Sequence, residues 1–190
     1  MNRLPRALLL FVLPLMISSM ASPAATSTAP SDGDMAVSFN VGLANAFDDT
    51  FDDVETVFTG TFEYYTSPRV SWRGLLGTTT FDAEPQSPGN RPSVDVTFID
   101  ANVVYNWDSG RVRPYVTGGV GAYQKNASSN SASDFISEFD ETTFGLNGGG
   151  GVDWYLGQRW AIKFEGVLHA LTGEDPQTIL IGTAGFKFWF

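Results

Sequence analysis

The chain has 190 residues, enough for one domain, with a formal net charge of −10 and no cysteine. The lack of cysteine excludes disulfides and thiolate metal sites, and one histidine leaves few ligands for zinc, iron or copper. We therefore expect no cofactor. The acidic balance also excludes ordinary nucleic-acid binding, which depends on Lys and Arg side chains that neutralise phosphates.

The first 21 residues have the features of a secretory signal peptide. Arg3 and Arg6 precede an apolar stretch, residues 7–17, that is too short to cross a bilayer as a helix. The small residues Ser19 and Ala21 predict cleavage after Ala21, with Ala25 as the alternative site. Residues 22–35 have the composition of turns and linkers, and we expect them to form a loose N-terminal tail.

Residues 36–190 alternate between apolar and polar side chains with a period of two, which predicts β-strands. Most of the segments are longer than strands of soluble proteins and long enough for a tilted membrane crossing of about 9–11 residues. Eight strands are expected, at residues 36–46, 55–66, 69–81, 94–107, 112–125, 141–156, 159–171 and 178–190.

The links between these segments alternate strictly between short and long. Residues 67–68, 108–111 and 157–158 form short turns, whereas residues 47–54, 82–93, 126–140 and 172–177 form longer polar links. Transmembrane barrels of outer membranes have short periplasmic turns and long outer loops. The sequence therefore predicts an all-β fold, an eight-stranded antiparallel up-and-down transmembrane barrel that starts and ends on the periplasmic side.

The two faces of the expected strands differ in charge. In the last strand Phe186, Phe188 and Phe190 share an uncharged face and Lys187 lies on the other, so the first face should meet lipid. Three acidic and four basic residues should point inward: Glu63, Arg73, Asp100, Arg113, Lys163, Glu165 and Lys187. The interior of an eight-stranded barrel is just wide enough for side chains to fill, so paired charges predict a plugged, polar lumen.

Aromatic residues gather near the strand ends at the periplasmic side, as in an interfacial girdle. The expected girdle consists of Trp72, Tyr105, Trp107, Trp154, Trp160, Phe188 and Phe190. A soluble barrel would instead bury its aromatic side chains inward and expose its charges.

Two motifs resemble those of a known family. The chain ends with aromatic residues at alternate positions, and Arg113-Pro114-Tyr115-Val116 opens a glycine-rich strand. Together they resemble the outer-membrane protein β-barrel domain family, with its OmpA-like, OmpX-like and OmpW-like barrels, over about residues 36–190. The resemblance implies residence in the outer membrane, contact with lipopolysaccharide, and recognition of Phe186, Phe188 and Phe190 by the barrel-assembly machinery. It does not extend to the peptidoglycan-binding domain of full OmpA-type proteins, so we expect no cell-wall tether.

An acidic loop and the single histidine are the candidates for chemistry. The carboxylates of Asp48, Asp49, Asp52, Asp53 and Glu55 suit hard cations, although their spacing lacks the glycine and final glutamate of an EF-hand. They form either a solvated loop or a site where divalent cations bridge to lipopolysaccharide. His169 lacks the His-x-Ser-Asn pattern that lipid A deacylases would show, so a hydrogen-bonded histidine is favoured over a catalytic base.

Two further segments have structural interpretations. The run Gly148-Gly149-Gly150-Gly151 lacks the strand-to-helix setting of a phosphate-binding loop, and should let neighbouring strands pack closely. Residues 126–140 contain Phe135, Ile136 and Phe139, which either form a partner patch or extend the strand.

The sequence predicts a monomeric barrel without enzymatic activity, with a structural or surface-interaction role in membrane integrity or adhesion. Many of the acidic residues lie in or beside the long links, so the outer surface should repel anionic partners. The alternatives are a narrow channel for small solutes, a lipid A-modifying enzyme, and a soluble lipocalin-like barrel.

Overall fold

The computed structural model describes residues 30–47, 54–82, 93–107, 110–128, 141–172 and 177–190. Within these ranges no helix is long and apolar enough to span a membrane. The described chain forms eight strands: β1 (Met35–Ala46), β2 (Glu55–Ser67), β3 (Val70–Asp82), β4 (Ser93–Asn106), β5 (Val112–Ser128), β6 (Glu141–Tyr155), β7 (Trp160–Leu171) and β8 (Thr178–Trp189).

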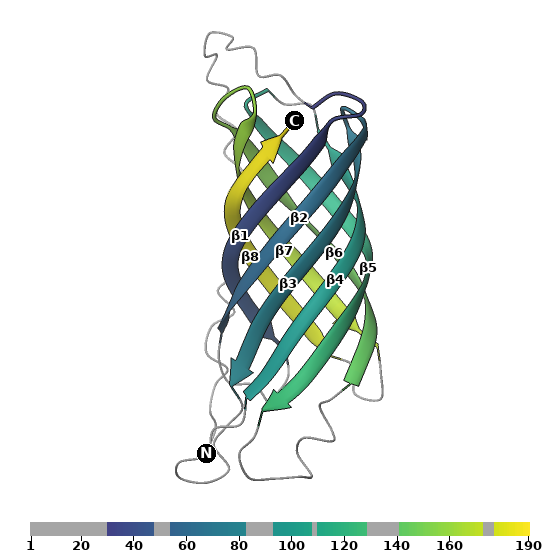
Figure 1. Ribbon diagram of the computed structural model, residues 1–190, viewed down its shortest axis with the longest axis vertical. Coiled ribbons are helices and arrows are strands. Elements are labelled where there is room, and N and C mark those ends of the chain that lie inside the picture. The colour runs from purple at the N-terminus through teal and green to yellow at the C-terminus, as the bar shows by residue number, and fades with distance from the viewer. Residues whose placement is uncertain (1–29, 48–53, 83–92, 108–109, 129–140, 173–176) are drawn as a thin grey trace, which may run out of the picture.

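The eight strands form a closed antiparallel barrel in which each strand pairs with its neighbours in the sequence and β8 closes on β1 (Figure 1). All eight predicted strands are confirmed. The largest difference is at β5, which runs to Ser128 because Asn126, Ala127 and Ser128 pair with Asp95, Val94 and Ser93 of β4. The interpretation of residues 126–140 as loop is therefore wrong for the first three of them.

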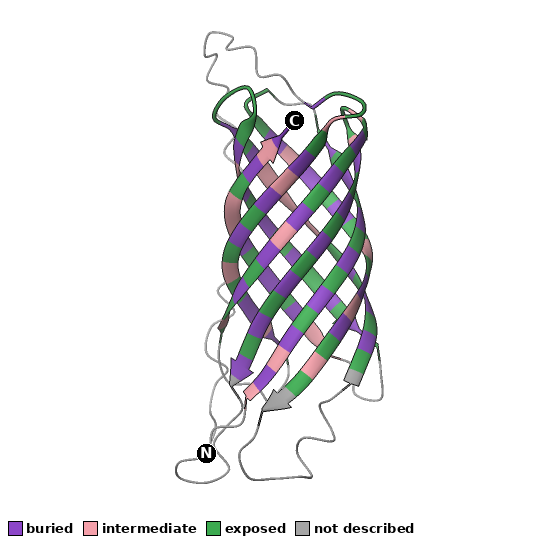
Figure 2. Ribbon diagram, in the orientation of Figure 1, coloured by how far each residue is buried: buried purple, intermediate pink, exposed green. Residues whose placement is uncertain are grey.

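Buried and exposed residues alternate along every strand, as the banding in Figure 2 shows. This alternation follows from the period of two in a strand, which places successive side chains on opposite faces of the barrel wall. The predicted division of β8 is confirmed, because Lys187 is buried in the lumen whereas Phe186 and Phe190 are exposed outside. The aromatic residues expected in the girdle point outward near the end with the short turns.

The short turns, the start of β1 and the end of β8 lie together at one end of the barrel, which we call the short-turn end (Figure 1). Between β2 and β3 the Ser67 hydroxyl accepts hydrogen bonds from the backbone N–H groups of Arg69 and Val70. The opposite end, which carries the long links, is called the long-link end.

Backbone hydrogen bonds at the short-turn end join the first and last strands. Met35 N–H donates to the Phe190 carbonyl at 3.1 Å, and Phe190 N–H donates to the Met35 carbonyl at 2.9 Å. Before β1, Gly33 takes a positive φ of 89° and its N–H donates to the Tyr65 carbonyl. The described end of the tail is thus attached to the barrel beside its closing seam.

Candidate functional site

The lumen holds a cluster of charged side chains, which we call the charged layer. Its members come from five strands and are all buried: Glu63, Arg73, Asp153, Lys163, Glu165 and Lys187. Each occupies an inward position in the alternation, and the strand register brings them together by pairing Glu63 with Arg73 and Asp153 with Lys163.

Lys187 is the centre of one half of the charged layer. Its Nζ donates to Glu63 Oε2 at 2.9 Å and to Asp153 Oδ2 at 2.8 Å. Glu63 also accepts hydrogen bonds from the hydroxyls of Tyr65 and Ser71. One ammonium group therefore balances two carboxylates that are shielded from water.

Arg73 and Glu165 form the other half. The guanidinium of Arg73 donates to Glu165 and to the Thr117 hydroxyl, and its Nη1 lies 4.0 Å from Glu63. Glu165 also accepts from the Tyr115 hydroxyl and lies 3.4 Å from Lys163 Nζ. The two halves thus meet between Arg73 and Glu63, and together they hold three acidic and three basic residues.

The sequence interpretation placed Glu63, Arg73, Lys163, Glu165 and Lys187 in one network, and the structure brings these five together. It missed Asp153, although the strand pattern carries the signal: Trp154 was expected in the outward aromatic girdle, so its neighbour Asp153 must point inward. Its side chain is fully buried.

Asp100 and Arg113 do not join the charged layer. Asp100 accepts a hydrogen bond from the Tyr123 hydroxyl, which also bonds His169 Nδ1 at 2.7 Å. Phe98 stacks on Tyr123 and meets the His169 ring edge-on. His169 is therefore a buried, hydrogen-bonded residue of the lumen.

Arg113 ties the short-turn end together. Its guanidinium donates to the carbonyl of Pro68, in the turn between β2 and β3, and more weakly to the carbonyl of Trp107. It also bonds the Tyr155 hydroxyl and lies over the Tyr155 ring. The partners of this arginine are thus carbonyl and phenol groups instead of the carboxylates that the sequence suggested.

The lumen nearer the long-link end is apolar, which the sequence interpretation did not anticipate. A cluster of twelve buried residues, the apolar layer, lies there: Ala44, Ala46, Val57, Leu75, Phe81, Val94, Val96, Phe98, Tyr123, Leu171, Ile179 and Ile181. A polar interior is therefore present only in part of the barrel, and aromatic side chains point inward as well as outward.

A second apolar cluster, the end layer, lies at the short-turn end and comprises Ala36, Tyr65, Tyr155, Ala161 and Trp189. Tyr65, Tyr155, Ala161 and Trp189 are each two residues from a member of the charged layer, on the side of the short turns. The charged layer is thus enclosed between two apolar clusters along the barrel axis.

Inward glycines make room for the large side chains of the lumen. A Cβ at Gly151 would overlap the Tyr115 ring and hydroxyl, and one at Gly121 would overlap the Asp100 carboxylate. A Cβ at Gly149 would overlap backbone atoms of β7. The interpretation of residues 148–151 as a continuous strand is confirmed, since all four lie within β6.

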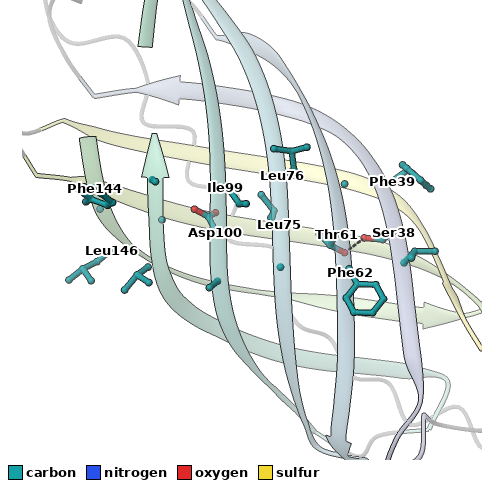
Figure 3. A pocket seen from close by; sticks show the side chains of 18 of the residues that line it. Ser38, Phe39, Thr61, Phe62, Leu75, Leu76, Ile99, Asp100, Phe144 and Leu146 are labelled. Atoms are coloured by element: carbon teal, nitrogen blue, oxygen red, sulfur yellow. Dashed lines mark hydrogen bonds between the residues drawn. The ribbon is translucent and has the colours of Figure 1, made fainter. Parts of the chain in front are cut away.

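A hollow along β1 to β6 is the pocket drawn in Figure 3. Buried polar side chains labelled there, such as Ser38, Thr61 and Asp100, belong to the lumen face of the wall. The exposed side chains in its lining are mainly apolar and outward, with Thr172 as a polar one; the apolar ones include Phe39, Phe62, Leu76, Ile99, Phe144 and Leu146. Such a surface suits contact with hydrocarbon and offers no set of polar groups to hold a substrate.

The predicted cation loop lies mostly outside the described residues. Asp48, Asp49, Asp52 and Asp53 are not described, and Glu55 begins β2. Phe135, Ile136 and Phe139 likewise lie outside them. Among the residues that the structure describes, no group of three or more His, Cys, Asp or Glu side chains could hold a metal ion.

A closed barrel with an uncharged, apolar outer belt and charges in its lumen defines an integral membrane protein that crosses the bilayer with strands. Residues 11–188 match the family model of the outer membrane protein beta-barrel domain. The chain belongs to this family, and its place is the cell outer membrane. No curated protein matches its sequence significantly.

Solved structures of small outer-membrane barrels share the fold. Neisserial surface protein A (NspA) is 14% identical with a TM-score of 0.63, over 83% of this chain and 99% of that one. OprG of Pseudomonas aeruginosa is 14% identical with a TM-score of 0.61, over 84% and 97% of the two chains. Ail, the attachment invasion locus protein of Yersinia pestis, is 15% identical with a TM-score of 0.60, over 84% of this chain and 99% of that one. That structure is a complex of Ail with the heparin analogue sucrose octasulfate.

Proposed function

We propose that the chain is a sealed outer-membrane barrel, a monomeric scaffold with a structural or surface-interaction role that presents its long loops to the cell exterior. The observation that carries this proposal is the layered lumen, in which the charged layer is enclosed by the apolar layer and the end layer. A barrel of this size has little interior space beyond that of its own side chains.

Both kinds of layer oppose the passage of solutes. A solute entering from the long-link end would have to displace packed side chains such as Phe98, Tyr123 and Leu171. It would then meet Lys187 and Arg73, whose hydrogen bonds to carboxylates would have to break in a setting shielded from water. The alternative of a narrow small-solute channel requires a path that avoids both obstacles.

Solute uptake by liposomes tests this proposal. Liposomes that contain the folded protein should swell no faster in isosmotic arabinose or glycine than liposomes without protein. Swelling that grows with the amount of inserted protein would instead support the small-solute channel.

Adhesion by capture of anionic glycans is a poor fit for this chain. Ail was crystallised with a highly sulfated heparin analogue, a ligand that calls for basic residues. This chain has 11 basic and 21 acidic residues, so its surface should repel such polyanions. Any surface partner of the acidic loops should be neutral or cationic, and divalent cations at Asp48, Asp49, Asp52 and Asp53 would bridge them to lipopolysaccharide.

An enzymatic role is disfavoured by the setting of His169. Its Nδ1 forms a hydrogen bond with the Tyr123 hydroxyl, and Phe98 contacts its ring edge-on. The ring is buried in the lumen, away from the lipid surface where lipid A would be modified. We predict that overexpression of the chain, and of its His169→Ala variant, leaves the mass spectrum of lipid A unchanged. A new lipid A species that depends on His169 would establish the enzyme instead.

A further inference from the structure

One carboxylate of the lumen lacks a basic partner. Asp100 is 2% exposed, and among the described residues its only ion-pair contact is with His169, whose Nδ1 lies 3.8 Å from Asp100 Oδ2. This Nδ1 is already hydrogen-bonded to the Tyr123 hydroxyl. The charged layer balances its own three acidic and three basic residues, and Arg113 bonds carbonyl groups at the short-turn end. The charge of Asp100 is therefore left without a counter-ion in the described lumen.

Three side-chain oxygen atoms in this part of the lumen have no hydrogen-bond partner among the described residues. They are Asp100 Oδ2, Asn102 Oδ1 and Asn147 Oδ1, and we call them the oxygen cluster. All three residues are more than nine-tenths buried. Because an unpaired buried acceptor is costly, such a set calls for a partner that carries positive charge or donates hydrogen bonds.

Strand register brings the oxygen cluster together over β5. Asn102 of β4 and Asn147 of β6 both pair with Gly119, one from each side. Asp100 pairs with Gly121, the next inward position of β5. A Cβ at Gly119 would overlap Asn102 Oδ1, and one at Gly121 would overlap Asp100 Oδ1. The two side chains of β4 therefore lean across β5 toward Asn147.

The oxygen cluster lies between the apolar layer and the charged layer. Along β4, Asp100 is two residues from Phe98 of the apolar layer, and Asn102 pairs with Arg73 of the charged layer. The guanidinium of Arg73 is hydrogen-bonded to Glu165. The cluster is thus buried beside a positive group that already has its own carboxylate partner.

We propose that the oxygen cluster binds one monovalent metal cation, with Asp100, Asn102 and Asn147 as its protein ligands. Carboxylate and amide oxygens are ligands that hard cations prefer. The single carboxylate balances one positive charge. A divalent ion would leave an uncompensated positive charge near Arg73, which would repel it.

A cation satisfies this site in a way that neither a water molecule nor a proton does. Water would donate hydrogen bonds to the oxygen cluster but leave the buried charge of Asp100 unbalanced, which is costly away from bulk solvent. A proton on Asp100 would remove the charge but leave the amide oxygens of Asn102 and Asn147 unpaired. A metal cation balances the charge and contacts all three oxygens.

Rubidium is the probe for a direct test, because its anomalous X-ray scattering distinguishes it from water. The full chain is folded and crystallised with RbCl as the only alkali salt, so that the ion is present when the lumen closes. We expect an anomalous peak in contact with Asp100 Oδ2 and at least one of the two amide oxygens. Water density without an anomalous signal at this position would overturn the assignment.

Thermal unfolding in non-ionic detergent, followed by tryptophan fluorescence, tests the site in solution. The unfolding midpoint of the wild type should be higher in RbCl than in choline chloride of the same ionic strength, because choline is too bulky for the site. Asp100→Asn keeps the shape of the side chain but removes its charge, and it should abolish the difference between the two salts.

The matched control is Asp95→Asn, which removes a carboxylate from the outward face of the same strand, where Asp95 accepts a hydrogen bond from Thr80. It should keep the full difference between the salts. The assignment is overturned if the wild type has the same midpoint in both salts, or if Asp100→Asn retains the difference. Liposome swelling reads passage through the lumen and these experiments read a bound ion, so the two proposals fail independently.

Discussion

Lys187 illustrates how single residues maintain the lumen of this barrel. Its ammonium group is within 3 Å of both Glu63 and Asp153, and all three side chains are at most 2% exposed. Lys163 is equally buried, yet its closest carboxylate, on Glu165, is 3.4 Å away and already accepts hydrogen bonds from Arg73 and Tyr115. Lys187 therefore hydrogen-bonds two carboxylates, whereas Lys163 lies near one carboxylate that has other partners.

Replacing Lys187 with Met should lower the free energy of unfolding by about 3–5 kcal/mol, because the buried carboxylates of Glu63 and Asp153 both lose the ammonium group that hydrogen-bonds them. Lys163→Met is the matched control and should cost clearly less, since Glu165 keeps its other partners. Urea unfolding of the protein in lipid vesicles measures both. Equal losses in the two variants would contradict the central position of Lys187.

Two glycines on the neighbouring strands β6 and β7 distinguish the effect of close packing from that of strand propensity. Gly149 faces the lumen, and a Cβ there would overlap the Gly166 carbonyl and the Val167 Cα, which are backbone atoms that cannot turn aside. Gly166 faces outward, and a Cβ there would have nothing within 4 Å. We predict that Gly149→Ala destabilises the barrel by about 1–3 kcal/mol.

Gly166→Ala should be neutral or slightly stabilising, because glycine inside a strand is unfavourable relative to alanine by about 0.5–1 kcal/mol. The same vesicle unfolding experiment compares the two variants. A loss at Gly166 as large as that at Gly149 would show that the outward glycines also have a packing role.

At the scale of elements, the strands and their faces follow from the sequence because the period of two is local information. The positions of Lys187 and Phe186 on opposite faces of β8 needed nothing beyond alternation. Pairing across the lumen is different, since it depends on which strands face each other over the barrel axis. Hence Asp100 and Arg113 were assigned to the network, although one bonds Tyr123 and the other bonds carbonyl groups.

The apolar layer shows the same limit for a whole set of residues. Phe98 and Tyr123 are inward by alternation, but the seven inward charged residues predicted a polar lumen. The axial level of a residue depends on strand tilt and register, which bring these inward apolar residues together toward the long-link end. A single strand does not encode that level.

Strand β8 carries the expected assembly signal and closes the barrel by pairing with β1, from Ala36 opposite Trp189 to Ala46 opposite Ile179. Two further backbone hydrogen bonds between Phe190 and Met35 extend this pairing at the short-turn end. Deleting Phe190 removes both the aromatic ring and these bonds, whereas Phe190→Ala removes only the ring. We predict that both changes reduce the amount of barrel in the outer membrane while synthesis and export continue, as measured by fractionation and immunoblotting.

Phe47→Ala serves as the control, since it removes an exposed aromatic side chain at the opposite end of the barrel. It should leave assembly unchanged. Normal outer-membrane levels of Phe190→Ala, alongside loss of the deletion variant, would mean that barrel closure matters and the terminal ring does not.

At the scale of the whole molecule, the barrel combines three layers in its lumen with an outward face rich in exposed apolar side chains. The buried charged groups lie between the two apolar clusters along the barrel axis. This arrangement suits a protein whose function lies on its surface, because a transport path would need a hydrated route through the axis.

Ion conductance across a planar lipid bilayer tests the sealed lumen most directly, since ions require less space than any nutrient. Insertion is verified by heat-dependent gel mobility of the protein recovered from the membrane. The account predicts no reproducible unitary current at either polarity. Steady unitary currents that scale with the amount of inserted protein would contradict it and make this barrel a channel.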